Sequence, residues 1–395
     1  MTMNTRVLSI DIMRGLTLFL MLFVNDLYEP GVPQWLVHTK GDFDGMGLAD
    51  WVFPGFLFMV GMSIPYAVKS RRNKGETDLQ LLCHIVLRTL SLLLIGILML
   101  NSGRLNPELT GINRLLWAFL MYVSVFLVWN QYAKTEQYKT VFLILKIIGI
   151  VGLGYLIYIF KAGDSENIQW LEKGWWGILG LIGWGYFTAA IGYLLVKDRI
   201  APAILLWLFF VGINILSQLG MLGFLRSINP ILGVITAGNV PSIVLSGLVI
   251  GMVVKTYIAQ PKKLFITILC LGFFALVSGF VLRHWFVISK IWGTPSWAMV
   301  CNGVSMIVFA LLYYIVDVWK KVKWAVPFDV AGKNSLTTYL APDLIYFVSW
   351  GYGLPIFFYK QEANMFLAVS GSIVWAFAMI GFAAVLSRIN IKLKL

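Results

Sequence analysis

One polar loop, between the first two long apolar stretches of the chain, holds the residues best suited to chemistry. From Asp26 to Asp50 it carries one histidine, His38, and five acidic residues, in a chain of which only 12% is charged. An imidazole beside carboxylates can act as a general base or accept an acyl group. A loop histidine is also common on a solvated surface, and Asp50 equally suits the N-cap of the following helix. The loop alone leaves both interpretations open.

The composition predicts an all-α polytopic membrane protein. Hydrophobic residues make up 59% of the chain, and apolar runs of about 17 to 22 residues recur, each long enough to cross roughly 30 Å of hydrocarbon. We expect a bundle of about 11–12 transmembrane helices, with residues 1–395 forming one transmembrane domain. The predicted spans are 7–27, 50–68, 82–101, 112–130, 140–160, 176–196, 202–221, 240–257, 264–282, 295–318, 334–352 and 366–387.

The basic residues predict the orientation, because loops on the cytoplasmic side carry the excess of Lys and Arg. With the N-terminus inside, 19 of the 31 Lys and Arg residues, Arg6 and Lys134 among them, fall on inner segments and span edges. Eight fall on outer loops and four within spans. We therefore expect both termini in the cytoplasm, and we assign the formal charge of +13 to orientation in a lipid bilayer rather than to nucleic acid.

The first span carries a polar stripe. Asp11 and Arg14 are three residues apart and can pair on one helix face, and Asn25 lies eleven residues beyond Arg14, nearly three turns or about 16 Å along the axis. Ionisable residues within a membrane span, here also Arg88, are costly and indicate function. A purely structural ion pair of Asp11 with Arg14 is the alternative.

Cysteines and tryptophans give no sign of a further site. The three cysteines lack the paired spacing of a zinc site, so we expect buried thiols and no metal. The group Trp175, Trp176 and Trp184 is typical of an interfacial belt and bundle packing rather than of a sugar-stacking platform.

A series of short segments, in order along the chain, carries a family resemblance. They are Ser9-Ile10-Asp11-Ile12-Met13-Arg14-Gly15, Phe23-Val24-Asn25, His38, Ala49-Asp50-Trp51-Val52-Phe53-Pro54, Arg88, Gly111-Ile112-Asn113-Arg114, Asn229-Pro230-Ile231-Leu232-Gly233, Lys290-Ile291-Trp292-Gly293-Thr294-Pro295-Ser296 and Gly332-Lys333-Asn334-Ser335-Leu336. Over nearly the whole chain this order resembles the heparan-α-glucosaminide N-acetyltransferase family. The opening blocks are the specific ones, and the later ones are weak singly.

The resemblance implies a transmembrane acetyltransferase, which moves an acetyl group from cytosolic acetyl-CoA to an amino sugar across the membrane. His38 is then the catalytic residue, and Asn25 and Asp50 orient it or hold the acetyl carbonyl. Asn334 and Ser296 are expected to line the same cavity and contact acetyl-CoA. His38 can act as a base in direct transfer, which we favour, or can carry the acetyl group itself.

The polar stripe fits this chemistry, since a pantetheine arm of roughly 15 to 20 Å could lie along the face from Arg14 to Asn25. Basic residues at the inner rim are needed for the phosphates. We expect Arg14, with its partner Asp11, and Arg88 to bind the phosphates, and Arg71, Arg72 and Lys333 are further candidates. Arg114 is predicted nearer the outer end, at the acetyl group or the sugar.

The chain departs from the family pattern after His38, where Phe43-Asp44-Gly45 replaces Trp-Asn-Gly and the loop is longer. Asp44 adds negative charge that would favour a cationic amine over a sulfated polymer. With Trp292 it is expected at a small amino-sugar acceptor, or at a cell-wall sugar if the enzyme is an O-acetyltransferase. No soluble domain precedes the first span, so a bacterial inner-membrane protein is expected, and the family suggests a homodimer.

Two other classes remain as alternatives. A secondary transporter is the main one, because twelve spans with both ends inside is a common carrier layout. We see no repeat between the halves, however, and the motifs of the first span have no counterpart near the seventh. A membrane scaffold without chemistry would leave Asp11, Arg14 and Arg88 without purpose.

Overall fold

All twelve predicted spans are helices. The computed structural model describes residues 7–133 and 135–395, so Arg6 and Lys134 lie outside the described residues. The twelve helices are α1 (Leu8–Asp26), α2 (Leu48–Arg72), α3 (Asp78–Ser102), α5 (Arg114–Trp129), α6 (Lys139–Ile159), α7 (Gly177–Val196), α8 (Ile200–Gln218), α10 (Asn239–Tyr257), α11 (Pro261–Leu282), α12 (Pro295–Tyr313), α14 (Ser335–Gly351) and α15 (Met365–Arg388).

Ten of these helices are long and apolar enough to cross a membrane. The other two, α5 and α14, have 16 and 17 residues. α14 contains Pro342 and Asp343, and both residues lie within one continuous helix. The chain is therefore an integral, all-α polytopic membrane protein, as predicted.

The remaining elements are short and lie between the long helices. In the described residues they are the helices α4 (Pro107–Thr110), α9 (Asn229–Ala237) and α13 (Val326–Lys333), a π-helical turn, η4 (Tyr314–Val318), that continues α12, and the antiparallel strands β1 (Ala162–Gly163) and β2 (Ile168–Gln169), in which Ala162 pairs with Gln169. Single 3-10 turns are η1 (Glu29–Gly31), η2 (Glu136–Tyr138), η3 (Gly223–Leu225), η5 (Lys323–Ala325) and η6 (Pro355–Phe357).

Several helix starts follow local signals in the sequence. Thr77 and Thr294 accept hydrogen bonds from backbone N–H groups of the first turns of α3 and α12, and Asn113 does the same for α5. Such side chains satisfy N–H groups that have no partner within the helix. Pro261 and Pro295 occupy the first helical position, where the missing N–H is not needed.

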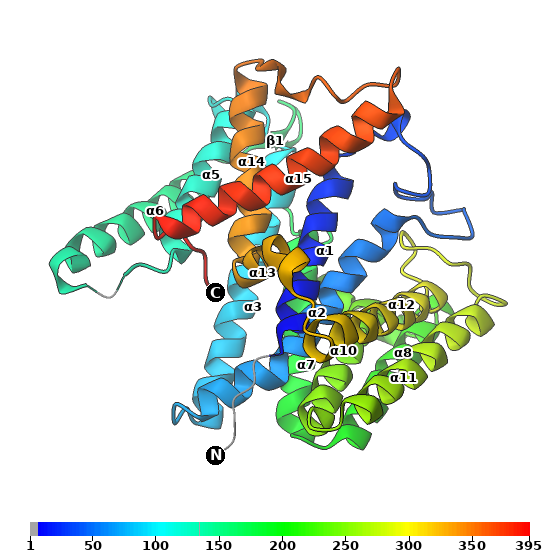
Figure 1. Ribbon diagram of the computed structural model, residues 1–395. Helices are drawn as coiled ribbons and strands as arrows, with labels where there is room; N and C mark the ends of the chain where they lie inside the picture. Colours follow the sequence, from blue (N-terminus) through cyan, green and yellow to red (C-terminus); the bar gives the residue numbers. More distant parts are fainter. Residues whose placement is uncertain (1–6, 134) are drawn as a thin grey trace.

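The centre of the bundle is α10, of which 83% is buried, against 17% for α6, which projects away from the bundle at one side (Figure 1). α10 packs against α2 through glycines. A Cβ added to Gly247 would lie 1.9 Å from the Phe58 carbonyl oxygen, and one added to Gly61 would lie 1.8 Å from that of Val244. Small residues allow two backbones to approach closely where lipid gives no hydrophobic force between helices.

A second close approach joins α1 to α13. A Cβ on Gly15 would lie 1.7 Å from the Phe328 carbonyl oxygen, and one on Gly332 would lie 2.0 Å from that of Asp11. Because Arg14 and Lys333 are the neighbours of these two glycines, the contact brings two cationic residues from opposite ends of the sequence together.

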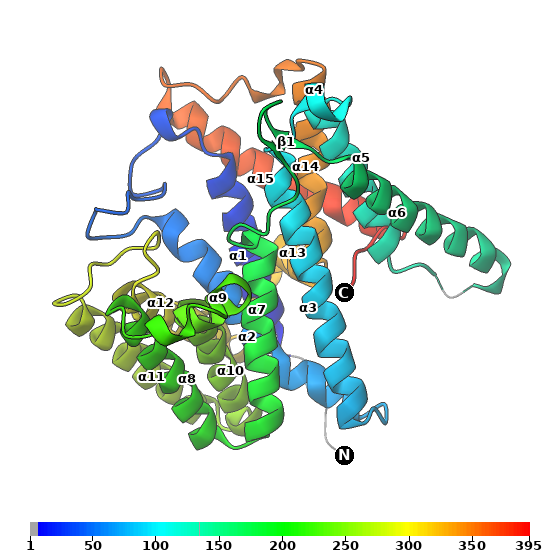
Figure 2. The same cartoon turned by 180° about the vertical axis from the view of Figure 1, so that it is seen from behind.

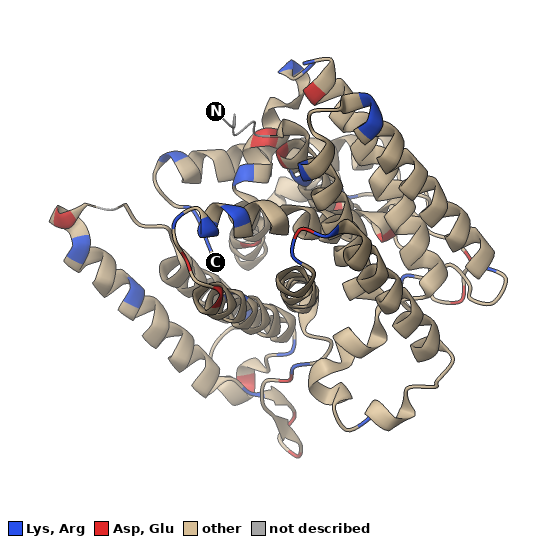
Figure 3. Cartoon of the chain, turned by 90° about the horizontal axis from the view of Figure 1, so that it is seen from below, with Lys and Arg blue, Asp and Glu red and all other residues tan. Residues whose placement is uncertain are grey.

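The two ends of the bundle can be named by α1, which begins at Leu8 and ends at Asp26. Figure 2 shows α3 and α7 side by side. Figure 3 looks at the molecule from the Leu8 end and shows Lys and Arg on several helix ends and loops of that face. The C-terminal residues also reach this end, since Lys394 lines one cavity with Arg14.

The cysteines differ from the prediction of buried thiols. Cys83 and Cys270 are exposed, and only Cys301 is buried. The first two lie on α3 and α11, on helix faces that the bundle leaves uncovered.

Candidate functional site

His38 and Asp50 form a hydrogen-bonded pair at the Asp26 end of the bundle. The His38 Nδ1 lies 2.8 Å from the Asp50 Oδ1, and the side chains are 43% and 1% exposed. An ionised carboxylate only accepts hydrogen bonds, so Nδ1 carries the hydrogen in this pair. In the neutral ring Nε2 is then the nitrogen that can take a proton or an acyl group.

Asp50 accepts more hydrogen bonds than capping of a helix requires. It is the third residue of α2, and its Oδ2 accepts hydrogen bonds from the Gly47 N–H at 3.0 Å, the Thr39 N–H at 3.1 Å and the Thr39 hydroxyl at 2.9 Å. The N-cap is Gly47, which corrects the prediction that Asp50 takes that place. The carboxylate instead joins the loop to the start of α2 and holds Thr39, the residue that follows His38, by two hydrogen bonds.

Lys290 reaches His38 from a distant part of the sequence. Its Nζ lies 3.1 Å from the Nδ1 and 3.3 Å from the Nε2 of the ring. Burial lowers the pKa of the Lys290 ammonium below its ordinary value, and the nearby Asp50 carboxylate opposes that shift. The lysine comes from segment 283–294, which joins α11 to α12.

Hydrogen bonds between two loops bring Lys290 to this position. The Gly45 N–H donates to the Ile288 carbonyl oxygen at 3.0 Å, and the Ser289 hydroxyl donates to that of Gly41 at 3.1 Å. The loop between α1 and α2 and the segment 283–294 therefore run side by side, as Figure 1 also shows.

Asp44 belongs to this connection between the loops. Its carboxylate accepts hydrogen bonds from the Ile288 N–H and the Arg283 Nε, both at 2.8 Å. These two contacts hold the pKa of Asp44 below its ordinary value. The charge that the sequence predicts at an acceptor amine is thus neutralised by Arg283, and Asp44 does not line the cavity around His38.

A cavity of about 200 Å³, here called the histidine cavity, surrounds the reactive groups. Its polar lining side chains are His38, Lys290, Asn25 and Asn239, and its apolar ones include Met21, Val24, Phe53, Trp175 and Trp297. Asn25 lies at the end of α1, at one wall. The three predicted catalytic residues are therefore close together, His38 and Asn25 on the cavity wall and Asp50 behind the histidine.

A second cavity, of about 360 Å³, lies toward the Leu8 end and is here called the basic cavity. Four cationic side chains line it, and among the described residues of its wall no side chain is acidic. The cationic residues are Arg14, Arg88, Lys333 and Lys394. Phe56, Val60, Leu179 and Ile182 form part of its apolar wall.

Met21 of α1 lines both cavities. α2 and α7 also contribute to both walls, through Phe53 and Phe56 on α2 and through Ile178 and Leu179 on α7. The two cavities thus adjoin along α1, between Arg14 at one end and Asn25 at the other. This agrees with the polar stripe predicted from the spacing.

The two arginines of the basic cavity have different surroundings. Arg14 donates to the Ser63 hydroxyl at 2.6 Å and pairs with Asp11 at 3.3 Å. Arg88 stacks on the ring of Tyr186, 4.5 Å from its centroid, and its buried Nε has no hydrogen-bond partner among the described residues. An arginine in the centre of a membrane helix costs about 2.5–3.5 kcal/mol, so Arg88, with one buried N–H unpaired, is a candidate functional residue.

Besides Asp44 and Asp50, five predicted site residues line neither cavity. Asp11 contacts Arg14 behind the cavity wall. Asn334 lies next to Lys333 at the Leu8 end, whereas Ser296 lies at the Asp26 end and donates to the Val287 carbonyl oxygen at 2.8 Å. The two therefore do not share a cavity, because one begins α14 and the other begins α12, at opposite ends of the bundle.

Arg114 and Trp292 also lie outside the cavities. Arg114 is the first residue of α5 and is exposed, with its Nη1 donating to the Gly103 carbonyl oxygen at 3.3 Å. Trp292 is 63% exposed on the segment that carries Lys290. A substrate role for these residues and for Asp44 stays a prediction that the cavity geometry does not favour.

The sequence prediction omitted four cavity residues. Lys290 and Lys394 contributed only to the charge count that predicts the orientation, although Lys290 also lies in a segment that resembles the family, and Asn239 carried no signal of its own. Trp175, assigned to interfacial packing, lines the histidine cavity with 52% of its surface exposed. All four are brought to the cavities by tertiary contacts between distant segments.

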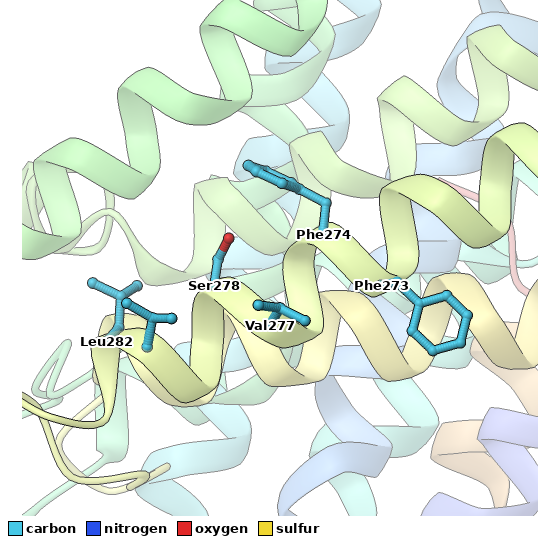
Figure 4. Close-up of a pocket in the computed structure, with 6 residues that line it drawn as sticks. Phe273, Phe274, Val277, Ser278 and Leu282 are labelled. Atoms are coloured by element: carbon cyan, nitrogen blue, oxygen red, sulfur yellow. The ribbon is translucent and has the colours of Figure 1, made fainter.

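A third cavity has no chemical groups suited to a reaction. It measures about 570 Å³ and lies on one face of α11, bounded by Phe273, Phe274, Val277, Ser278, Val281 and Leu282 (Figure 4). Its lining is almost entirely apolar, and its phenylalanines are exposed. This face is suited to contact with lipid.

Comparisons with known proteins agree with the resemblance found in the sequence. A family model described as "Domain of unknown function (DUF5009)" matches residues 6–218, more than half of the chain. Over 98 residues the chain is 38% identical to "Heparan-alpha-glucosaminide N-acetyltransferase" of Mus musculus and 37% identical to the protein of the same name of Homo sapiens.

The matched stretch makes up 25% of this chain and 14% of each relative, so the chain covers far less than two thirds of the length of these relatives. The resemblance to that N-acetyltransferase family is confirmed over this stretch. By the match to more than half of its length, this membrane protein belongs to the DUF5009 family.

Proposed function

We propose that this protein is a transmembrane acetyltransferase that transfers the acetyl group of acetyl-CoA to an amino sugar. The observation that carries the proposal is the pair of adjoining cavities along α1, one lined by four cations and the other by His38 and Lys290. The similarity of part of the chain to heparan-alpha-glucosaminide N-acetyltransferases supports the reaction class.

The basic cavity would bind the nucleotide end of acetyl-CoA. Arg14, Arg88 and Lys394 offer guanidinium and ammonium groups that match phosphate oxygens. The apolar wall that continues past Met21 suits the pantetheine arm, which would place the thioester in the histidine cavity. We place the basic cavity on the cytoplasmic side, because the segments at the Leu8 end carry the excess of basic residues.

The histidine cavity would bind the acceptor. Ligand pockets usually measure about 300–1,000 Å³, so a cavity of about 200 Å³ suits one sugar ring rather than a folded polymer. His38 would take the proton from the attacking amine at Nε2, while Asp50 holds Nδ1–H and stabilises the imidazolium that forms. The same arrangement serves a route in which His38 first accepts the acetyl group.

The experiment is transfer of labelled acetyl from acetyl-CoA to glucosamine by the purified protein in detergent, beside a reaction without acceptor. His38→Ala is expected to abolish transfer while binding of acetyl-CoA remains. His284→Ala is the matched control, since His284 is exposed beyond α11 and lines neither cavity. Absence of acetyl-CoA binding to the wild-type protein would overturn the proposal and favour a transporter.

A further inference from the structure

We propose that Lys290 is a catalytic residue, whose ammonium group binds the carbonyl oxygen of the acetyl thioester as that oxygen becomes negatively charged. The proposal rests on the acetyltransferase function and names the group that stabilises its transition state. It is carried by the position of Lys290 in the histidine cavity, beside His38.

The ring of His38 does not take up all three hydrogens of this ammonium. The Nζ of Lys290 lies at almost the same distance, 3.1 and 3.3 Å, from the two ring nitrogens. These nitrogens direct their hydrogen or lone pair away from each other in the ring plane, so one group cannot align with both. Because Nδ1 carries a hydrogen, only Nε2 can accept one from the ammonium, and at least two of its three hydrogens remain available for another acceptor.

No carboxylate takes up that charge. Among the described residues none forms an ion pair with Lys290 within 4.0 Å, whereas the neighbouring Asp50 and Asp44 pair with His38 and Arg283. The nearest acid, Asp50, already accepts hydrogen bonds from His38, Thr39 and Gly47. A half-buried ammonium without an acidic partner is partly desolvated, and an anion that forms only during the reaction would offset that cost.

The backbone around Lys290 is fixed. The Gly293 N–H donates to the Lys290 carbonyl oxygen at 3.0 Å, and the neighbouring Ser289 hydroxyl donates to Gly41 at 3.1 Å. The Ser289 N–H in turn donates to the Thr294 hydroxyl, which caps α12. Donors that are in place before the reaction need no rearrangement in the transition state, and this is the main source of such stabilisation.

The chemical step balances without a further reactant. The acceptor nitrogen forms a bond to the thioester carbonyl carbon, and the electron pair of the C=O bond moves to the oxygen, which the Lys290 ammonium binds. The proton of the amine passes to the Nε2 of His38. When the C=O bond re-forms, the C–S bond breaks, and the CoA thiolate takes the proton from His38. Asn25 and Asn239 lie in the same cavity, but an ionised donor forms a hydrogen bond about twice as strong as a neutral amide.

Because Lys290 must carry its charge to bind the oxyanion, the rate of acetyl transfer should depend on pH. The groups that act on it are His38 from the loop, Asp50 from α2 and Cys301 from α12. Because burial lowers the pKa of Lys290, its ammonium is lost at a lower pH than that of an ordinary lysine. The rate should therefore fall on the alkaline side as pH rises through this lowered pKa.

The experiment measures kcat and KM for acetyl transfer to glucosamine from pH 6 to 10 in Lys290→Met, Lys290→Arg and Lys40→Met. Lys40 is the matched control, since it is an exposed lysine of the adjacent loop and does not line the cavity. We expect Lys290→Met to lower kcat roughly 10²–10³-fold, as loss of an oxyanion donor does, with both KM values within a few-fold of the wild type. Lys290→Arg should keep part of the activity and shift the alkaline fall to higher pH.

Three results would overturn the proposal: a kcat near the wild-type value in Lys290→Met, a rise in KM alone, or an unshifted alkaline fall in Lys290→Arg. If Lys290→Met does not fold, the pH profile of Lys290→Arg decides. An inactive His38→Ala beside an active Lys290→Met would contradict only the role of Lys290. Wild-type protein that fails to bind acetyl-CoA would instead contradict the proposed function.

Discussion

Asp50 links the chemistry of His38 to the structure of the loop. One carboxylate oxygen contacts His38, and the other accepts three hydrogen bonds that close the loop onto α2. Holding His38 and closing the loop together need two oxygens that both accept hydrogen bonds. An ionised carboxylate has two such oxygens, and an amide has only one. The residue therefore has to be an acid, although an amide of the same size would fill the same space.

Asp50→Asn tests this account at the residue scale. The amide NH₂ must face either His38, which would favour the tautomer with the hydrogen on Nε2, or the donors of Thr39 and Gly47. We expect kcat for acetyl transfer to fall roughly 10²–10⁴-fold, as in other histidine sites that lose their orienting carboxylate.

Asp164→Asn is the control for that change, since Asp164 is exposed and uses its oxygen only to accept N–H groups of its own turn. Full activity in Asp50→Asn, with an unchanged melting temperature, would show that the carboxylate has no part in the reaction.

The sequence predicted the centre of the site but not all of its walls. His38, Asp50 and Asn25 were identifiable because they lie in short segments that resemble a family. Lys290 could not be assigned, because its place depends on hydrogen bonds between loops more than 200 residues apart. Asp44 was predicted at the acceptor amine because the sequence did not reveal its pairing with Arg283, which is also a contact between distant residues.

At the scale of elements, the helices were predictable and their packing was not. Apolar runs of sufficient length can only be helices in a bilayer, so ten of the twelve spans follow from length and hydropathy, whereas α5 and α14 are shorter. The short α9 and α13 gave no such signal. The sequence also did not predict which helices pack against each other, because the glycines that let α2 approach α10 lie on both helices, far apart in the chain.

Gly247→Ala tests the packing of α2 on α10. Alanine is favoured over glycine within a helix by about 1 kcal/mol, but its Cβ at this position would meet the Phe58 carbonyl oxygen. Overpacking of this kind costs about 1–3 kcal/mol, so we expect a lower apparent melting temperature in detergent.

Gly154→Ala on α6 is the matched control, because nothing lies within 4 Å of its added Cβ. Its melting temperature should equal or exceed that of the wild type. Equal melting temperatures for both variants would mean that α2 and α10 do not pack as closely as described.

At the scale of the whole molecule, the arrangement separates two chemical environments along the bundle. The basic cavity lies toward the Leu8 end and the histidine cavity toward the Asp26 end, with Met21 between them. Excess basic charge at the Leu8 end predicts that this end faces the cytoplasm. The proposed acetyl donor and acceptor would then enter from opposite sides.

Cysteine labelling tests this orientation. Cys83, Cys270 and Cys301 are first replaced, since two of them are exposed. Lys40→Cys, in the loop after α1, should react with an impermeant maleimide added outside intact cells, whereas Lys74→Cys, in the loop after α2, should react only after the membrane is opened. The reverse pattern would place the histidine cavity in the cytoplasm.

The most direct test of the central claim is acetyl transfer across a vesicle membrane. The protein is reconstituted in vesicles, with its orientation measured by the two labelled cysteines, and acetyl-CoA and glucosamine are supplied on chosen sides. The account predicts acetylated product when acetyl-CoA is on the side of the Leu8 end and glucosamine is on the other side. Product formed only when both reactants share one side would contradict a site that spans the membrane.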